Sequence, residues 1–337
     1  MPTPDRTLTR REAERLVAEV FQHNGASAQN AQSTALALVA AEIDGQKGHG
    51  FSRVASYAAQ LRSGKVNGAA RPVATRRGSR VDIDADNGLA FPAIDLAICE
   101  LTAVTPETGI AMAAIRRSHH CGQLGAHVER LAEAGLAALM VANAPKAMAP
   151  WGGSQALFGT NPIAFAVPRA DAAPLVIDLS LSRVARGKVM AASKRGDPIP
   201  KGWALDADGN PTTDPAAALS GTMVPAGDAK GAALALMVEI LAATLTGANH
   251  SNEATSFFDA EGAPPGVGQM ILAFDTAGVV GPGFGPRLET LLSAILAQEG
   301  TRLPGTTRLK KRAEAQKEDC VAIPGHLMDE IETMAGP

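Results

Sequence analysis

The chain has 337 residues, more than one hydrophobic core usually supports, so we expect two lobes. Its formal net charge of -3 provides no basic surface for nucleic acid. It lacks an apolar run long enough to span a membrane, and its polar start does not resemble a signal peptide. Cys99, Cys121 and Cys320 are too widely spaced for a disulfide framework or a metal site, so we expect a cytoplasmic protein.

The first part of the chain is predicted to be helical. Thr9 and Glu12 have the spacing of a capping box, and the apolar residues from Ala13 to Phe21 then recur on one helical face. Further helices are expected over 28–43 and from about 52 to 62. The glycine-rich segment 44–50 lies between them and is predicted to be a loop.

The pattern changes after residue 72. Alternating runs within 73–84 predict strands, and 90–105 predicts a helix. The apolar runs 110–116 and 137–142 predict buried strands, with a helix over 125–134 between them. This order predicts a mixed α/β fold. The Gly- and Pro-rich segment 197–228 predicts loops, and 231–245, which is apolar nearly all round, predicts a buried helix.

His49 and Arg53 form the first candidate site. His49 lies between Gly48 and Gly50, so neighbouring side chains cannot screen it, and histidine is the side chain that titrates near neutral pH. The guanidinium of Arg53 suits forked contacts with a carboxylate. A proton donor beside a residue that binds a carboxylate would suit the reduction of a carbonyl or imine group next to a carboxylate. The alternative is an ordinary solvated turn.

A second cluster, 118–125, follows a predicted strand and precedes a predicted helix, whose N-terminus favours phosphate. Its adjacent residues His119, His120 and Cys121 lack the spacing of a metal site. The small and turn-forming residues within 149–162 imply close approach of the backbone to a ligand or to another strand. Asp178 and Ser180 lie at the end of a predicted strand. They could contact a cofactor there, or simply end the strand.

These motifs together resemble the malate/L-lactate dehydrogenase-like family. Its members include sulfolactate dehydrogenases and the Δ1-piperideine-2-carboxylate/Δ1-pyrroline-2-carboxylate reductases. The matching motifs run in order from about residue 7 to about 330. They are Gly-His-Gly-x-x-Arg at 48–53, Ser-His-His-Cys-Gly at 118–122, Ala-Pro-Trp-Gly-Gly at 149–153, Phe-Gly-Thr-Asn-Pro-Ile-Ala at 158–164, Asp-x-x-x-Ser-x-x-Ala-Arg-Gly-Lys at 178–188 and Arg-Leu-Pro-Gly at 302–305.

The resemblance implies an α/β, non-Rossmann NAD(P)-binding fold with a largely antiparallel sheet plus a helical N- and C-terminal lobe. Residues 1–115 with 275–337 would form the helical lobe for substrate binding and dimerisation, and 116–274 the NAD(P)-binding lobe of a homodimer. No Gly-x-Gly-x-x-Gly follows a predicted strand, so the common doubly wound fingerprint is missing.

The resemblance also implies roles for single residues. His49 would be the proton donor, and Arg53 and Thr160 would contact a small carboxylate substrate. The cationic loop 302–308 would suit a 2′-phosphate, which favours NADP over NAD. The implied cofactor contacts are His120, Cys121, Gly122, Gln123, Leu124, Asp178, Leu179, Ser180, Lys230, Gly231, Arg302 and Arg308.

Two departures from the family pattern bear on the substrate. The imine-reducing members pair a serine before the proton donor with an acidic residue after Ala-Arg-Gly, and this chain has Gly48 and Lys188 there. We therefore place Lys188 with His49 in the catalytic set, holding a second anionic group of a malate-, lactate- or sulfolactate-type 2-oxo or 2-hydroxy acid. Segment 256–262 resembles the imine-reducing branch, so a cyclic ketimine reductase is the alternative, and a non-catalytic binding protein a remote one.

Overall fold

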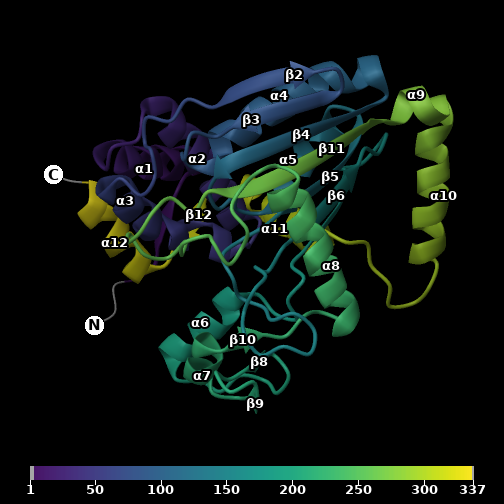
Figure 1. The fold of residues 1–337 in the computed structure, drawn as a ribbon. Helices are drawn as coiled ribbons and strands as arrows, with labels where there is room; N and C mark the ends of the chain where they lie inside the picture. The colour runs from purple at the N-terminus through teal and green to yellow at the C-terminus, as the bar shows by residue number, and fades with distance from the viewer. Residues whose placement is uncertain (1–3, 336–337) are drawn as a thin grey trace.

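The computed structural model describes residues 4–335, and the first and last helices of this range lie on one side of the molecule (Figure 1). Helices α1 (Arg10–His23), α2 (Ala28–Ile43), α3 (Val54–Ser63) and α12 (Gly325–Ala335) pack there around the buried rings of Phe21 and Tyr57. Strands β1 (Arg6–Leu8) and β12 (Val321–Ile323) pair beside them. The predicted capping box is confirmed, because Thr9 and Glu12 cap α1 reciprocally.

A seven-stranded mixed sheet forms the centre of the molecule. The pair β3/β4 is parallel and every other neighbouring pair is antiparallel. In spatial order the strands are β2 (Val73–Arg77), β3 (Arg80–Asp84), β4 (Ile110–Ser118), β11 (Val267–Asp275), β5 (Leu136–Ala142), β6 (Ile163–Val167) and β7 (Leu175–Leu179). The predicted α/β class is confirmed.

Helices α4 (Ala90–Thr108) and α5 (Leu124–Glu133) cover one face of this sheet. The alternation expected of strands decides which side chains they meet. In β3, for example, Val81 and Ile83 are buried against α4, whereas Asp82 and Asp84 point to the other face. On that other face, α8 (Ala229–Glu239) and the π-helical turn η3 (Ile240–Thr244) pack over the middle strands.

Two predictions about this second face are wrong. Segment 197–228 is not all loops, because it contains helix α7 (Pro215–Ser220) and a small sheet of β8 (Ala204–Leu205), β9 (Pro211–Thr212) and β10 (Thr222–Met223). The apolar segment 231–245 is helical but not enclosed, since one side of it faces outward. Leu234, Leu236, Met237 and Ile240 are 41–48% exposed there. An all-apolar pattern does not tell a helix buried in one chain from a helix with an outward apolar side.

The C-terminal region leaves the body and returns to it. Helices α9 (Thr276–Val280) and α10 (Phe284–Leu296) form an arm at the right of Figure 1, and Arg169 grips Glu289 of α10 through two hydrogen bonds of 2.7 and 2.8 Å. Helix α11 (Thr306–Glu318) then packs against α2. None of the helices within 4–335 is both long and apolar enough to cross a membrane.

Candidate active site

His49 and Arg53 are carried by two short 3-10 turns, η1 (Lys47–His49) and η2 (Phe51–Arg53), between α2 and α3. The turns are held against α2 by Glu42, whose carboxylate accepts a 3.1 Å hydrogen bond from the backbone N–H of Phe51. A Cβ at Gly50 would lie 2.2 Å from that carboxylate, so the close approach requires glycine. Burial raises the pKa of Glu42.

A chain of three side chains runs from His49 through His120 to Tyr57 on helix α3. Nδ1 of His49 lies 3.2 Å from Nε2 of His120, and the two rings stack with 5.1 Å between centroids. Nδ1 of His120 lies 2.5 Å from the hydroxyl of Tyr57. The sequence analysis missed Tyr57, although it is the chain's only tyrosine and lies one helical turn after Arg53. The structure thus brings together residues of two histidine motifs that the sequence analysis treated separately.

The histidines around this chain are held in their neutral form. Burial, and secondarily the charge of Arg53, lowers the pKa of His49 to about 4. Burial lowers the pKa of His120 well below its ordinary value. It also lowers the pKa of His119 to about 3 and that of His127 to about 4. His49 and His120 keep part of their surface open to a cavity, whereas His119 and His127 are enclosed.

Arg53 places a positive charge in the wall of that cavity. Its Nε donates a 2.7 Å hydrogen bond to the carbonyl of Gly48, and its guanidinium lies 4.5 Å from the centre of the Phe258 ring. Its Nη1 is buried, with no hydrogen-bond partner in the part of the chain that the structure describes. An unpartnered buried guanidinium nitrogen is costly and suits an anionic ligand.

The cavity has a volume of about 480 Å³ and gathers most of the predicted site. Arg186, which was not predicted, lines it on the side of α6 (Arg186–Arg195). The predicted residues that line the cavity are His49, Arg53, His120, Gly122, Gln123, Leu124, Thr160, Asp178, Leu179 and Ser180.

Other predicted residues lie away from this cavity. Lys188 is exposed on the first turn of α6, and Cys121 is buried behind the wall. Lys230 is exposed near the start of α8. Gly231 has a packing role, since a Cβ there would lie 1.9 Å from the carbonyl oxygen of Ala226. Arg302 is exposed beside a separate cavity of about 420 Å³.

Arg308 has an internal role that the sequence did not reveal. Its guanidinium grips the carboxylate of Glu129 with two hydrogen bonds of 2.8 and 2.9 Å, and both side chains are buried. These contacts occupy the two terminal guanidinium nitrogens of Arg308, which the sequence analysis expected to bind a cofactor phosphate. The prediction paired Arg308 with Arg302 because both lie in one basic segment, but only Arg302 points outward.

Asp178 links the cavity to helix α5. Its carboxylate accepts a 2.7 Å hydrogen bond from the backbone N–H of Gly125, in the first turn of that helix. A Cβ at Gly125 would lie 3.0 Å from the same carboxylate, so glycine permits this approach. Burial raises the pKa of Asp178.

Segment 251–266 closes the cavity on the side of α3. The ring of Phe257 lies 5.1 Å from that of His119 and 5.3 Å from that of His120. The buried ammonium group of Lys65 holds this segment by donating to the carbonyl of Ser256 at 2.8 Å and to the carboxylate of Asp259 at 3.0 Å. The segment thus packs the ring of Phe257 against the rings of His119 and His120.

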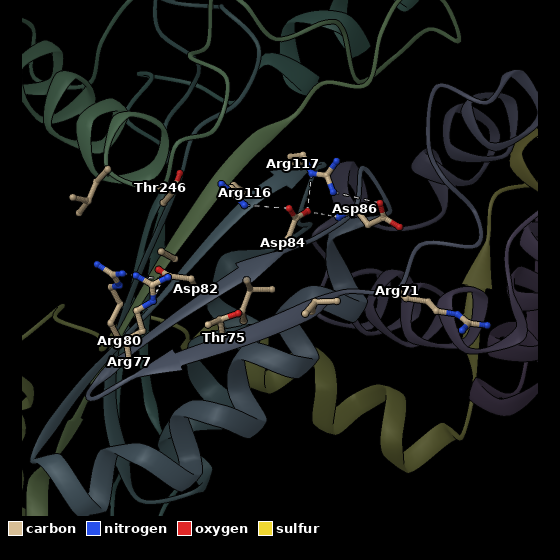
Figure 2. Close-up of a pocket in the computed structure, with 14 residues that line it drawn as sticks. Arg71, Thr75, Arg77, Arg80, Asp82, Asp84, Asp86, Arg116, Arg117 and Thr246 are labelled. Atoms are coloured by element: carbon tan, nitrogen blue, oxygen red, sulfur yellow. Dashed lines mark hydrogen bonds and ion pairs between the residues drawn. The ribbon is translucent and has the colours of Figure 1, made fainter.

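A larger cavity, of about 830 Å³, lies over the open face of β2, β3 and β4 (Figure 2). Figure 2 shows Arg116 and Arg117 beside Asp84, and Arg80 beside Asp82. None of the predicted site residues lines it. Its charges are largely paired with one another. The size of a cavity therefore does not locate the chemistry in this protein.

Comparison with known proteins identifies the family. The model of the malate/L-lactate dehydrogenase family matches residues 8–332. The chain belongs to this family. It is 52% identical over 330 residues to (2R)-3-sulfolactate dehydrogenase (NADP(+)) of Chromohalobacter salexigens, covering 98% of both chains. It is 39% identical to a Δ1-pyrroline-2-carboxylate/Δ1-piperideine-2-carboxylate reductase of Pseudomonas putida, covering 96% of each.

Solved structures agree with this assignment. The crystal structure of Δ1-piperideine-2-carboxylate reductase from Pseudomonas syringae is 37% identical and superposes with a TM-score of 0.92, over 98% of this chain and 99% of that one. Sulfolactate dehydrogenase from Methanocaldococcus jannaschii is 27% identical, with a TM-score of 0.88 over 98% and 96% of the two chains. The resemblance inferred from the motifs is confirmed, and the protein is an oxidoreductase.

The enclosed histidines predict acid sensitivity. The unfolded chain binds protons on His119 and His127 near pH 6.5, whereas the folded protein keeps both neutral down to about pH 4 or below. The unfolded state therefore binds more protons within this window, and the free energy of unfolding falls as the pH drops from about 6.5 towards 4. Each histidine contributes a slope of about 1.4 kcal/mol per pH unit there.

Urea unfolding of wild type and His127→Phe between about pH 4.5 and 7 measures this slope. His127 lies outside the cavity and its Nε2 is 2.7 Å from the carbonyl oxygen of Cys121. Its replacement removes one of these proton-binding groups, and the loss of that hydrogen bond is measured by the stability difference at about pH 7, where both histidines are neutral. We expect a shallower pH dependence in the variant. Equal slopes in the two proteins would show that His127 titrates alike in the folded and unfolded states.

Proposed function

We propose that the protein is an NADP-dependent dehydrogenase that interconverts a 2-oxo acid and a 2-hydroxy acid carrying a second anionic group, as sulfolactate does. The unpartnered Nη1 of Arg53 beside His49 carries this proposal. The cavity wall also holds Arg186 and Lys146 against one carboxylate, that of Asp178, so its charge favours a substrate with more than one negative group. The 52% identity to a sulfolactate dehydrogenase supports the same substrate class.

In the proposed reaction Arg53 binds the C1 carboxylate and His49 exchanges a proton with the oxygen on C2. Nδ1 of His49 is engaged by His120, so Nε2 is the nitrogen that meets the substrate. The neutral form of His49 accepts the hydroxyl proton during oxidation, provided that Nδ1 carries hydrogen and donates it to His120. His120 then donates to Tyr57 through its other nitrogen, which fixes one tautomer along the whole chain.

Substrate binding also changes the electrostatics at His49. Arg53 lowers the pKa of His49, and a carboxylate bound to Arg53 neutralises that repulsion. The imidazolium formed in oxidation, and needed as proton donor in reduction, is then easier to hold. Phe257 and Phe258 limit water in the cavity, which strengthens these interactions.

The residues of the cavity fit a nicotinamide cofactor, which when bound supplies or takes up the hydride at C2. Leu179 presents an apolar side chain that is 45% exposed, and the hydroxyl of Ser180 makes only long hydrogen bonds of 3.3 and 3.4 Å. We assign the backbone of 120–124 with Leu179 and Ser180 to the cofactor, and the exposed Arg302 to a 2′-phosphate. This makes 116–274 the NAD(P)-binding lobe, non-Rossmann in type, and 1–115 with 275–337 the helical lobe.

Arg186 takes the role that the sequence suggested for Lys188. It lines the cavity and is half-buried, and it donates a long hydrogen bond of 3.4 Å to the carbonyl of Leu219. Among residues 4–335 no carboxylate pairs with it. We therefore assign Arg186 to the second anionic group of the substrate, and Arg53 to the first.

The first prediction concerns His49. His49→Ala is expected to lower kcat for reduction of sulfopyruvate by about 10²–10⁴-fold, because a positioned proton donor contributes about that factor. NADPH binding, followed by its fluorescence, should stay close to wild type. NADPH oxidation at 340 nm with sulfopyruvate, oxaloacetate and pyruvate measures the loss. A variant that keeps most of its activity would remove His49 from the mechanism.

A second prediction separates Arg186 from Lys188. Arg186→Met should raise the KM for sulfopyruvate by about 10- to 100-fold, since a charge-assisted contact contributes about 1.5–3 kcal/mol. The KM for pyruvate, which has one anionic group, should change by less than about twofold. Lys188→Met on the same helix is the matched control and should leave both values near wild type. The reverse pattern would restore Lys188 as the anion ligand.

Cyclic ketimine reduction is the second candidate function, supported by the 39% identity to the Pseudomonas putida reductase. Lys188 and Gly48 stand at the positions where that branch is expected to have an acid and a serine. Including Δ1-pyrroline-2-carboxylate and Δ1-piperideine-2-carboxylate in the same assay separates the candidates. Faster turnover of an imine than of every oxo acid would favour the reductase.

We also propose that the enzyme is a cytoplasmic homodimer. Apolar side chains of the arm are exposed, with Val279 at 75%, Leu291 at 58% and Leu296 at 52%, and α8 has an outward apolar side. A helix of 13 residues with few contacts to its own body needs a partner surface. Light scattering should give twice the chain mass of 34.6 kDa, and Leu291→Glu should give a single chain. A wild-type monomer would contradict this.

A further inference from the structure

Two buried carboxylates and two arginines form a closed cluster behind the active site. Arg312 donates to Asp44 through Nε at 2.9 Å and Nη2 at 2.8 Å, and to Glu129 through Nη2 at 2.9 Å. Arg308 grips Glu129 with both nitrogens of its fork and approaches Asp44 at 3.5 Å. The Asp44 and Glu129 side chains are 1% and 5% exposed, so the positive and negative charges are neutralised within the protein.

Each carboxylate belongs to an element next to a catalytic loop. Asp44 is the C-cap of α2, directly before the turns that carry His49. Its carboxylate also accepts a 3.1 Å hydrogen bond from the side chain of Gln123, which follows His120 by three residues and lines the cavity. Glu129 lies on α5, the helix that begins after Gln123. The cluster is therefore connected, on the side away from the cavity, to both the turn that carries His49 and the loop that carries His120.

Helix α11 supplies both arginines and is held mainly by these charges. Arg308 and Arg312 are one turn apart, so they lie on the same face of the helix. Arg308 is the one buried residue of α11, and most of the helix is polar and exposed. A helix with so little apolar contact is set in place by the geometry of its ion pairs, which is strict for forked guanidinium contacts.

We propose that Arg312, supported by Arg308, is a positioning residue that sets the distance between His49 and His120 through Asp44 and Gln123. The catalytic histidines lie on short turns rather than on long helices, so their separation depends on what holds those turns. Asp44 is joined through the backbone to the turn that carries His49, and through its hydrogen bond with Gln123 to the loop that carries His120. Arg312 fixes the carboxylate that joins them. This inference rests on the proposed role of His49 in proton transfer.

Arg312→Met tests the proposal, because it removes the fork but keeps a long side chain. We expect kcat for the oxo acid to fall by about 10- to 100-fold, as misplaced reacting groups do. The KM for NADPH should change less than kcat, because Leu179, Ser180 and Arg302 of the proposed cofactor site do not depend on this cluster. The control is Lys317→Met, on the exposed last turn of the same helix, which should leave both values unchanged. Rates are compared below the melting temperature of every variant.

Histidine NMR titration provides a readout independent of turnover. In wild type, His49 faces Arg53 and His120, and both remain in the variant. If the turn loosens, water reaches the imidazole and the pKa of His49 rises from about 4 towards its ordinary value. Should Arg312→Met fail to fold, Arg312→Lys keeps the charge without the fork, and the same changes are expected with smaller size.

The outcomes separate this inference from the proposed function. A lower melting temperature with unchanged kcat and an unchanged pKa of His49 would overturn the proposal, since Arg312 would then only stabilise the fold. A wild type that reduces none of the oxo acids would refute the proposed function. The titration of His49 in Arg312→Met would still decide whether the cluster positions the histidines.

Discussion

The guanidinium of Arg53, which pairs with no carboxylate among residues 4–335, is the constraint on which the rest of the site depends. A buried charge that has lost its partner is strongly destabilising, on the order of 3–5 kcal/mol. Here the compensation within the described chain is a carbonyl at 2.7 Å and the face of Phe258, and Nη1 is left over. The folded protein therefore favours an anion at this point. The neutral state of His49 and His120 follows first from burial, which lowers the pKa of both, and then from the same positive charge.

Carboxylates arrange the loops around that constraint. Glu42 holds the backbone of η2, and Asp178 caps α5. Glu239, buried on α8, accepts 2.6–2.8 Å hydrogen bonds from the side chain of Asn161 and from the backbone and hydroxyl of Ser251. Buried carboxylates require full hydrogen bonding, so each one specifies the position of the backbone around it. A cavity built from turns acquires in this way a rigidity that turns alone lack.

Local features of the sequence predicted the fold well. The capping box at Thr9, the helix at 28–43 and the strands at 110–116 and 137–142 depend on neighbours a few residues apart, and they match the structure closely. The motifs marked His49 and His120 separately, but their contact was not predicted, because the two residues are 71 positions apart. The pairing of Arg308 with Glu129 was not foreseen, because the two residues are 179 positions apart and no local pattern marks the pair. The outward side of α8 was missed for a related reason. An apolar sequence indicates that a helix packs against something, but not whether that surface belongs to its own chain or to a second one.

The glycine that precedes His49 illustrates how the same fold can change its chemistry. A Cβ at Gly48 would meet nothing within 4 Å, so a serine would fit there and its absence is not a steric necessity. What a serine and an acid would do for the imidazole, orienting it and selecting its tautomer, is done in this structure by His120 and Tyr57. Gly48 lines the cavity, and without a side chain it leaves room beside His49. Under the proposed function, the neutral pair beside His49 would repel a second negative group on the substrate less than an anionic relay would.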